Sequence, residues 1–91
     1  MAGDRRPPVD VKALGDRLVE LRGDRSLKDV ARSIWEKQVY DLTDSAINML
    51  EHGKVPNPRI RTIDALATEY GVSVEYLVYG AKEKRRRAQA R

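Results

Sequence analysis

Three residue types that hydrolases use for nucleophilic catalysis occur together near the middle of the chain. Ser45 follows Asp44 directly, and His52 is the only histidine of the protein. Side chains that share one face of one helix do not form the geometry of a nucleophile, a base and an orienting acid. The chain also lacks cysteine and a glycine-rich phosphate loop, and one histidine cannot build a histidine metal cluster. We therefore expect no enzyme, no metal site and no cofactor.

The same stretch fits contact with duplex DNA better. Residues 43–52 are predicted to form a helix with Ala46, Ile47 and Leu50 facing inward. Its outward side chains are Asp44, Ser45, Asn48, Met49 and His52. An ordinary solvated helix carries charged pairs at i, i+4 spacing, whereas short polar side chains suit the base edges of a major groove. Taken alone, this helix fits a plain polar surface about as well.

Cations directly after this helix favour the DNA interpretation. Lys54, Arg59 and Arg61 are basic, and Asn57 lies among them. Donors in these positions can hold phosphates while the helix reads bases, which is how sequence-specific binders divide their contacts. The N–H groups at the start of the next helix would add to the phosphate contacts.

Five short helices are predicted to position these residues, with no alternating strand pattern and no internal repeat. The expected N-caps are Asp10, Ser26, Thr43, Asn57 and Ser73, and glycines at positions 23, 53, 71 and 80 end four of the helices. Pro58 would occupy the first position of the fourth helix, whose inward stripe is Ile60, Ile63, Leu66, Ala67 and Tyr70. The second helix is expected to continue through Trp35 to about Gln38. The sequence thus predicts an all-α domain at residues 10–80.

Composition and charge bound the remaining possibilities. The 91 residues are 41% hydrophobic and 5% aromatic, which fits one small domain with an aliphatic core. No apolar run reaches the ~18 residues of a membrane helix, and residues 1–9, a flexible arm, lack the apolar core of a secretory signal. We therefore expect a cytoplasmic protein. Residues 81–91 carry a formal charge of +5 and residues 1–80 carry −1. This tail is either a polyanion contact or a solvated segment that aids solubility.

Residues 11–80 resemble the helix-turn-helix domain of the Cro and lambda-type phage repressors, the XRE family. The matching segments are SLKDVA at 26–31, AINMLEHGK at 46–54, PR at 58–59 and YGVSVEYL at 70–77, of which the last is the most specific. The resemblance implies a five-helix lambda-repressor-like domain. It also implies a sequence-specific regulator of transcription that binds double-stranded DNA, a phage or bacterial repressor with residues 43–52 as recognition helix. Such a regulator would be associated with the nucleoid through DNA, or would lie in the host cytoplasm if phage-encoded.

The resemblance also assigns roles to individual residues. The base-reading positions correspond to Asp44, Ser45, Asn48 and Met49. The phosphate-contacting positions correspond to Ser26, Leu27, Thr43, Lys54 and Arg59, and Lys28, His52, Asn57 and Arg61 extend that set. A family ion pair between the first and third helices corresponds to Arg22 and Glu51, which we expect to be largely buried.

Three departures from the family pattern affect these roles. Leu27 stands where the family commonly has a phosphate-binding Gln. Asp44 is an acid close to DNA, which either accepts from a cytosine amino group or favours the helix dipole. The segment between Ala31 and Glu51 is longer than usual, with the extra residues around 35–42. We therefore expect an extended second helix and no tight turn after it.

The fifth helix is relevant both to assembly and to one of two alternative functions. Family members bind palindromes as two-fold dimers through the fifth helix. Val72, Val74, Val78 and Tyr79 offer modest apolar surface there. We expect a weak homodimer that forms mainly on the DNA operator, with a monomer on an asymmetric site as the alternative. The rivals are an antitoxin-like or other protein-interaction module using Trp35, Tyr40 and the fifth helix, and an RNA binder using the basic tail.

Overall fold

The protein is all-α in the part that its computed structural model describes, residues 9–80. The helices are α1 (Val11–Arg22), α2 (Leu27–Gln38), α3 (Asp44–Glu51), α4 (Ile60–Tyr70) and α5 (Val74–Tyr79), and no strand occurs among these residues. The predicted all-α class is therefore confirmed for these residues, as is the extension of the second helix to Gln38. The basic tail at 81–91 and all of the predicted arm except Val9 lie outside the described residues.

Local sequence sets the start of four helices as predicted. The side chains of Asp10, Ser26, Thr43 and Ser73 each accept a hydrogen bond from the backbone N–H three residues later, at 2.9–3.1 Å. Each bond satisfies one of the N–H groups that a helix leaves without an internal partner. α4 and α5 end at Gly71 and Gly80, both in the left-handed conformation with φ of 70°, where a side chain would be strained.

The predicted start of the fourth helix is wrong. Asn57 was expected as N-cap and Pro58 as the first helical residue, but α4 begins at Ile60 after an extended Arg59, and no side chain caps it. Pro58 stays in the loop, where it is half-buried and lines two surface grooves. As a consequence Ile60, predicted to be buried, stands at the tip of α4 and is 73% exposed.

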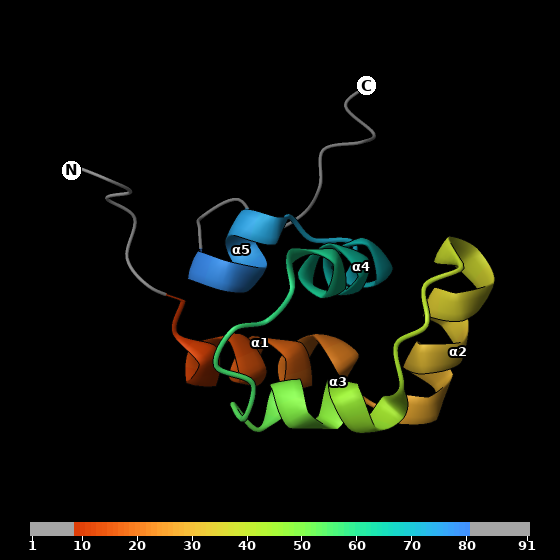
Figure 1. The fold of residues 1–91 in the computed structure, drawn as a ribbon, viewed down its shortest axis with the longest axis horizontal. Coiled ribbons are helices and arrows are strands. Elements are labelled where there is room, and N and C mark those ends of the chain that lie inside the picture. The colour runs from red at the N-terminus through yellow and green to blue at the C-terminus, as the bar shows by residue number, and fades with distance from the viewer. Residues whose placement is uncertain (1–8, 81–91) are drawn as a thin grey trace.

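The core lies between α1, α2, α4 and α5, with α3 packed against it from one side. Leu14, Leu18, Ile34, Ile47, Leu66 and Leu77 are completely buried. α1 contacts α3 and α5, α2 contacts α3 and α4, and α4 contacts α5. In Figure 1, α3 forms the lower edge of the molecule, below α1 and α4. Among the described helices, none has the length and apolarity needed to cross a bilayer.

α1 and α3 approach so closely that only glycine fits between them. Gly15 is buried in α1, and a Cβ atom added to it would lie 2.8 Å from the carbonyl oxygen of Leu50 and closer still to that of Glu51. Both obstacles are backbone atoms, which cannot turn aside as the end of a side chain can. The close approach therefore fixes the distance between α1 and α3.

We expect Gly15→Ala to destabilise the protein, although alanine favours a solvent-exposed helix over glycine by ~1 kcal/mol. Overpacking a tight contact costs about 1–3 kcal/mol, so after the propensity gain the free energy of unfolding should still fall, by up to ~2 kcal/mol. Urea unfolding measures the change, and Glu20→Ala on the exposed side of α1 is the control, expected to stay within ~0.5 kcal/mol of the parent. A more stable Gly15→Ala protein would contradict the close approach.

Candidate nucleic-acid interface

The orientation of α3 follows from what its inward side contacts. Ile47 and Leu50 are buried in the core, and Ala46 packs against it. Thr43 caps the start of the helix through a bond of 3.0 Å from the Ala46 N–H to its hydroxyl. The helix covers residues 44–51 with caps at Thr43 and His52, which agrees with the predicted bounds.

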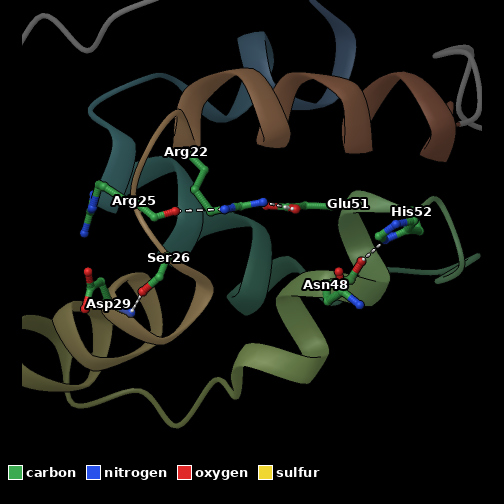
Figure 2. Close-up of polar contacts among 7 residues, drawn as sticks. All are labelled: Arg22, Arg25, Ser26, Asp29, Asn48, Glu51 and His52. Atoms are coloured by element: carbon green, nitrogen blue, oxygen red, sulfur yellow. Dashed lines mark hydrogen bonds and ion pairs between the residues drawn. The ribbon is translucent and has the colours of Figure 1, made fainter.

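An ion pair with α1 fixes the other end of α3. Arg22 Nε donates to Glu51 Oε2 at 2.7 Å, and Arg22 Nη2 donates to Oε1 at 2.9 Å, a two-point contact between guanidinium and carboxylate. The Glu51 side chain is 2% exposed and that of Arg22 22%. Arg22 Nη1 also donates to the carbonyl oxygen of Arg25 at 2.8 Å (Figure 2). The predicted pair is confirmed, and it holds the pKa of Arg22 above its usual value.

The predicted base-reading residues lie on the exposed side of α3, with one exception. Ser45, Asn48 and Met49 are exposed, as is His52 at the end of the helix. Asp44 is half-buried, and its Oδ1 accepts from the Ser45 N–H at 2.9 Å. Of the two roles open to Asp44, this bond favours the local one, a carboxylate at the positive end of the helix.

His52 is held against its own helix. Its Nδ1 lies 2.8 Å from the carbonyl oxygen of Asn48 (Figure 2). A carbonyl oxygen can only accept, so Nδ1 carries the proton, and Nε2 of the neutral ring is then an acceptor. A neutral His52 in this position cannot donate to a phosphate oxygen. The predicted phosphate contact would therefore require the imidazolium form.

The start of α2 contributes a smaller set of the predicted phosphate-binding residues. Ser26 and Lys28 are exposed, while Leu27 is half-buried and packs against the core. The Ser26 oxygen accepts from the Asp29 N–H at 3.0 Å, which leaves the hydroxyl proton for a phosphate oxygen. Leu27 has no polar group to offer a phosphate and contributes to packing instead.

The loop after α3 brings the remaining polar residues next to it. The Lys54 N–H donates to the Met49 carbonyl at 3.0 Å, which folds the loop back onto the helix. Lys54, Asn57 and Arg59 are exposed. Met49, Asn57 and Arg59 line one groove of about 220 Å³, together with apolar residues such as Leu42 and Val55. The structure therefore gathers these predicted residues along one side of α3 and its loop.

The long connection between α2 and α3 is not a tight turn, as predicted, and the structure shows in addition that it packs against α4. Gln38 Nε2 donates to the Ala65 carbonyl at 2.9 Å, and the Tyr40 hydroxyl lies 2.8 Å from Thr62 Oγ1. In Figure 1 the connection descends from the upper end of α2 to the level at which α3 begins. Arg61 lies over the Tyr40 ring, with its guanidinium carbon 4.8 Å from the ring centre.

Charged residues that the sequence analysis did not single out surround the Arg22–Glu51 pair. Arg25 pairs with Glu69 at 2.7 Å, and the Glu69 side chain is 2% exposed. The hydroxyl of Tyr70 is buried without a hydrogen-bond partner among the described residues. Its position in the apolar stripe of α4 indicated burial, but nothing in the spacing indicated that Glu69 would be buried as well. The inner side of α3 therefore rests on a polar cluster as well as on the aliphatic core.

Comparison with protein-family models, with curated proteins and with solved structures found no match for this chain. The geometry and chemistry of the residues themselves must therefore carry any functional conclusion.

Breaking the ion pair from its two sides should have unequal effects. Arg22→Met leaves the Glu51 carboxylate buried without a counter-charge and should cost ~3 kcal/mol of unfolding free energy. Glu51→Ala should cost less, because Arg22 can still reach solvent and the Arg25 carbonyl. Denaturant unfolding of both variants and of the double variant measures the coupling, with exposed Arg32→Met as matched control. If Arg22→Met lowered the free energy of unfolding no more than Arg32→Met does, the structural role of the pair would be refuted.

Alkaline pH should destabilise the protein through Tyr70. Burial, together with the nearby Glu51 carboxylate, raises the pKa of Tyr70 from 10.0 to about 12. Between these values the unfolded chain loses the phenolic proton while the folded chain keeps it, so this contribution to stability is complete below pH 10 and is lost as the pH rises toward 12. Unfolding at about pH 9 and about pH 11 should show a smaller decline in Tyr70→Phe than in the parent. An equal decline in both proteins would exclude Tyr70 as the cause.

Proposed function

We propose that residues 10–80 are a helix-turn-helix domain similar to those of the Cro and lambda-type repressors, and that α3 binds the major groove of duplex DNA. The observation that carries the proposal is the division of α3 into two sides. Ile47, Leu50 and Glu51 are held by the core and by Arg22, and the opposite side presents Ser45, Asn48 and Met49 to solvent. The activity is sequence-specific regulation of transcription, as a repressor.

The exposed position of α3 supports this proposal. A B-DNA major groove is about 12 Å wide and admits one α-helix. α3 lies at an edge of the molecule in Figure 1, where no other labelled helix lies beneath it. A helix in the interior of a bundle could not enter a groove, whatever its side chains.

The residues around α3 divide into base readers and phosphate binders. Asn48 is the principal base reader, because its amide can make two hydrogen bonds to the N6 and N7 edge of adenine. Lys54, Arg59 and Lys28 bind phosphates on either side of the groove, and the Ser26 hydroxyl adds a neutral donor. The described residues carry ten Lys and Arg against twelve Asp and Glu, so within residues 9–80 these local cations must supply the attraction.

Assembly on DNA remains a prediction within this proposal. Of the four residues named for the dimer contact, Val72 and Val78 are buried in the core, Val74 is partly buried and Tyr79 is exposed. Tyr79 and the exposed Ile60 line one groove between α4 and α5. This apolar surface is smaller than the sequence indicated, which fits a weak dimer formed on the operator or a monomer on an asymmetric site.

A protein-interaction module is the second candidate, and one observation favours it. Trp35 is 53% exposed and Val39, one helical turn later, is 69% exposed. Val39 also has a left-handed backbone with φ of 52°, which is costly for a β-branched residue. Tyr40, the other residue expected at such a surface, is directed to Thr62 instead. The RNA-binding alternative depends on the tail, which lies outside the described residues.

Selection from a random duplex library followed by salt titration separates these functions. A DNA-binding regulator should enrich one sequence, bind it far more tightly than random duplex, and lose affinity steeply with salt. A protein-interaction module should enrich none, and a tail-dependent RNA binder should prefer RNA to either duplex.

Two substitutions should separate sequence reading from phosphate binding. Asn48→Ala should cost about 1–3 kcal/mol on the selected duplex and relax the preference at one base position. Lys54→Ala should weaken binding to all duplexes alike and reduce the salt slope by ~1. Lys37→Ala, at the end of α2, is the control for Lys54→Ala and should change neither the affinity nor the salt slope. Asn48→Ala that weakens all sequences equally would contradict the base-reading role.

A further inference from the structure

The aromatic ring of Tyr40 contacts Arg61, one of the residues expected to bind phosphate. We propose that Tyr40 is a positioning residue, which holds the Arg61 guanidinium in place for a phosphate of the duplex backbone. The inference rests on the proposed DNA binding and deepens it by assigning a task to the segment that lengthens the α2–α3 connection.

The Tyr40 ring is fixed before any ligand arrives. Its hydroxyl is bonded to Thr62 Oγ1 at 2.8 Å, and Thr62 is itself buried in α4. On the chain before it, Gln38 is bonded to the Ala65 carbonyl at 2.9 Å, and on the chain after it Leu42 is buried in the core. These three attachments to α4 and the core leave the ring little freedom to rotate or move away.

The contact between ring and guanidinium preserves the donors that phosphate needs. Arg61 is exposed, and its guanidinium carbon lies 4.8 Å from the centre of the Tyr40 ring. A guanidinium is flat, with its N–H groups directed outward in its own plane. A guanidinium stacked on an aromatic ring uses its flat face, so in that arrangement its edge remains able to make two parallel bonds to phosphate oxygens.

The position of Arg61 on α4 gives an independent reason to expect an anion. Arg59 is the N-cap of α4 and Arg61 is its second residue, and the first turn contains no acidic residue. Cations are disfavoured at the positive end of a helix dipole, whereas an anion there is stabilised. Two arginines at this end raise the local positive potential, and a bound phosphate would relieve their repulsion. In the absence of phosphate, the Tyr40 ring holds the Arg61 guanidinium close to the helix.

Substitution of both partners tests the proposal by a double-variant cycle on a random-sequence duplex. Arg61→Ala should reduce the salt slope by ~1. Tyr40→Leu should weaken binding about two- to fivefold, the factor expected for a cation–π contact at an exposed site. Arg61→Ala should then have less effect in the Tyr40→Leu protein than in the parent. All measurements are made below the melting temperatures of the variants.

Conservative substitutions distinguish positioning from a structural role. Tyr40→Phe keeps the ring and loses the bond to Thr62, so it should lower the melting temperature while binding stays close to that of the parent. Arg61→Lys keeps the charge and loses the flat face, so it should bind as weakly as Tyr40→Leu. The proposal is overturned if the effects of Tyr40→Leu and Arg61→Ala are additive. It is also overturned if Tyr40→Leu leaves binding unchanged while Lys54→Ala weakens it. Absence of duplex binding by the parent protein would overturn the proposed function along with it.

Discussion

α3 can present its polar side to solvent because α1 holds its inner side at two points. Gly15 lets the backbones approach, and Arg22, two helical turns later on the same side of α1, binds Glu51. α3 has only eight residues, too few to be stable as an isolated helix. Its existence and its rotation about its own axis therefore depend on tertiary contacts. If α3 turned by a third of a revolution, the polar side would enter the core and the proposed function would be lost.

The lengthened connection between α2 and α3 replaces local geometry with tertiary contacts. A tight turn would fix the angle between two helices through the backbone alone. Here the end of α2 is attached to α4 through Gln38, and the connection is attached to α4 through Tyr40 and to the core through Leu42. The placement of α3 relative to α2 therefore depends on α4 as well. The same attachment brings Tyr40 to Arg61, so one segment serves both the fold and the proposed interface.

Electrostatics also constrains how the described domain could bind a polyanion. Acidic residues outnumber basic ones between positions 9 and 80, so the average field does not favour DNA. Arg22 and Arg25 are engaged with the buried carboxylates of Glu51 and Glu69. Attraction must then come from a few exposed cations in particular places, such as Lys54. A small set of contacts makes affinity modest and leaves discrimination between sequences to the base-reading side chains.

The sequence by itself determined the helices and most of their ends. Capping side chains such as Ser26 and Thr43, and glycines after the last turn, act within a few residues of the chain, so their effect can be read locally. The apolar spacing gave the inward side of α3, and the resemblance gave the Arg22–Glu51 pair that the structure contains. The proposed residues of α3 and the loop after it follow from the same local pattern, whereas Ser26 follows from the resemblance.

Only the tertiary structure decided which contacts join distant parts of the chain. Pro58 stays in a loop, where it is half-buried, and α4 starts two residues later than its sequence suggested, although a proline suits the first helical position. From the sequence alone, Gly15 is only a weak helix former inside a helix. Its role becomes clear from the close approach of α3. Tyr40 meets Arg61, and Glu69 is buried beside Arg25, through contacts between separate elements. Such contacts depend on how helices pack, which periodicity within one helix does not specify.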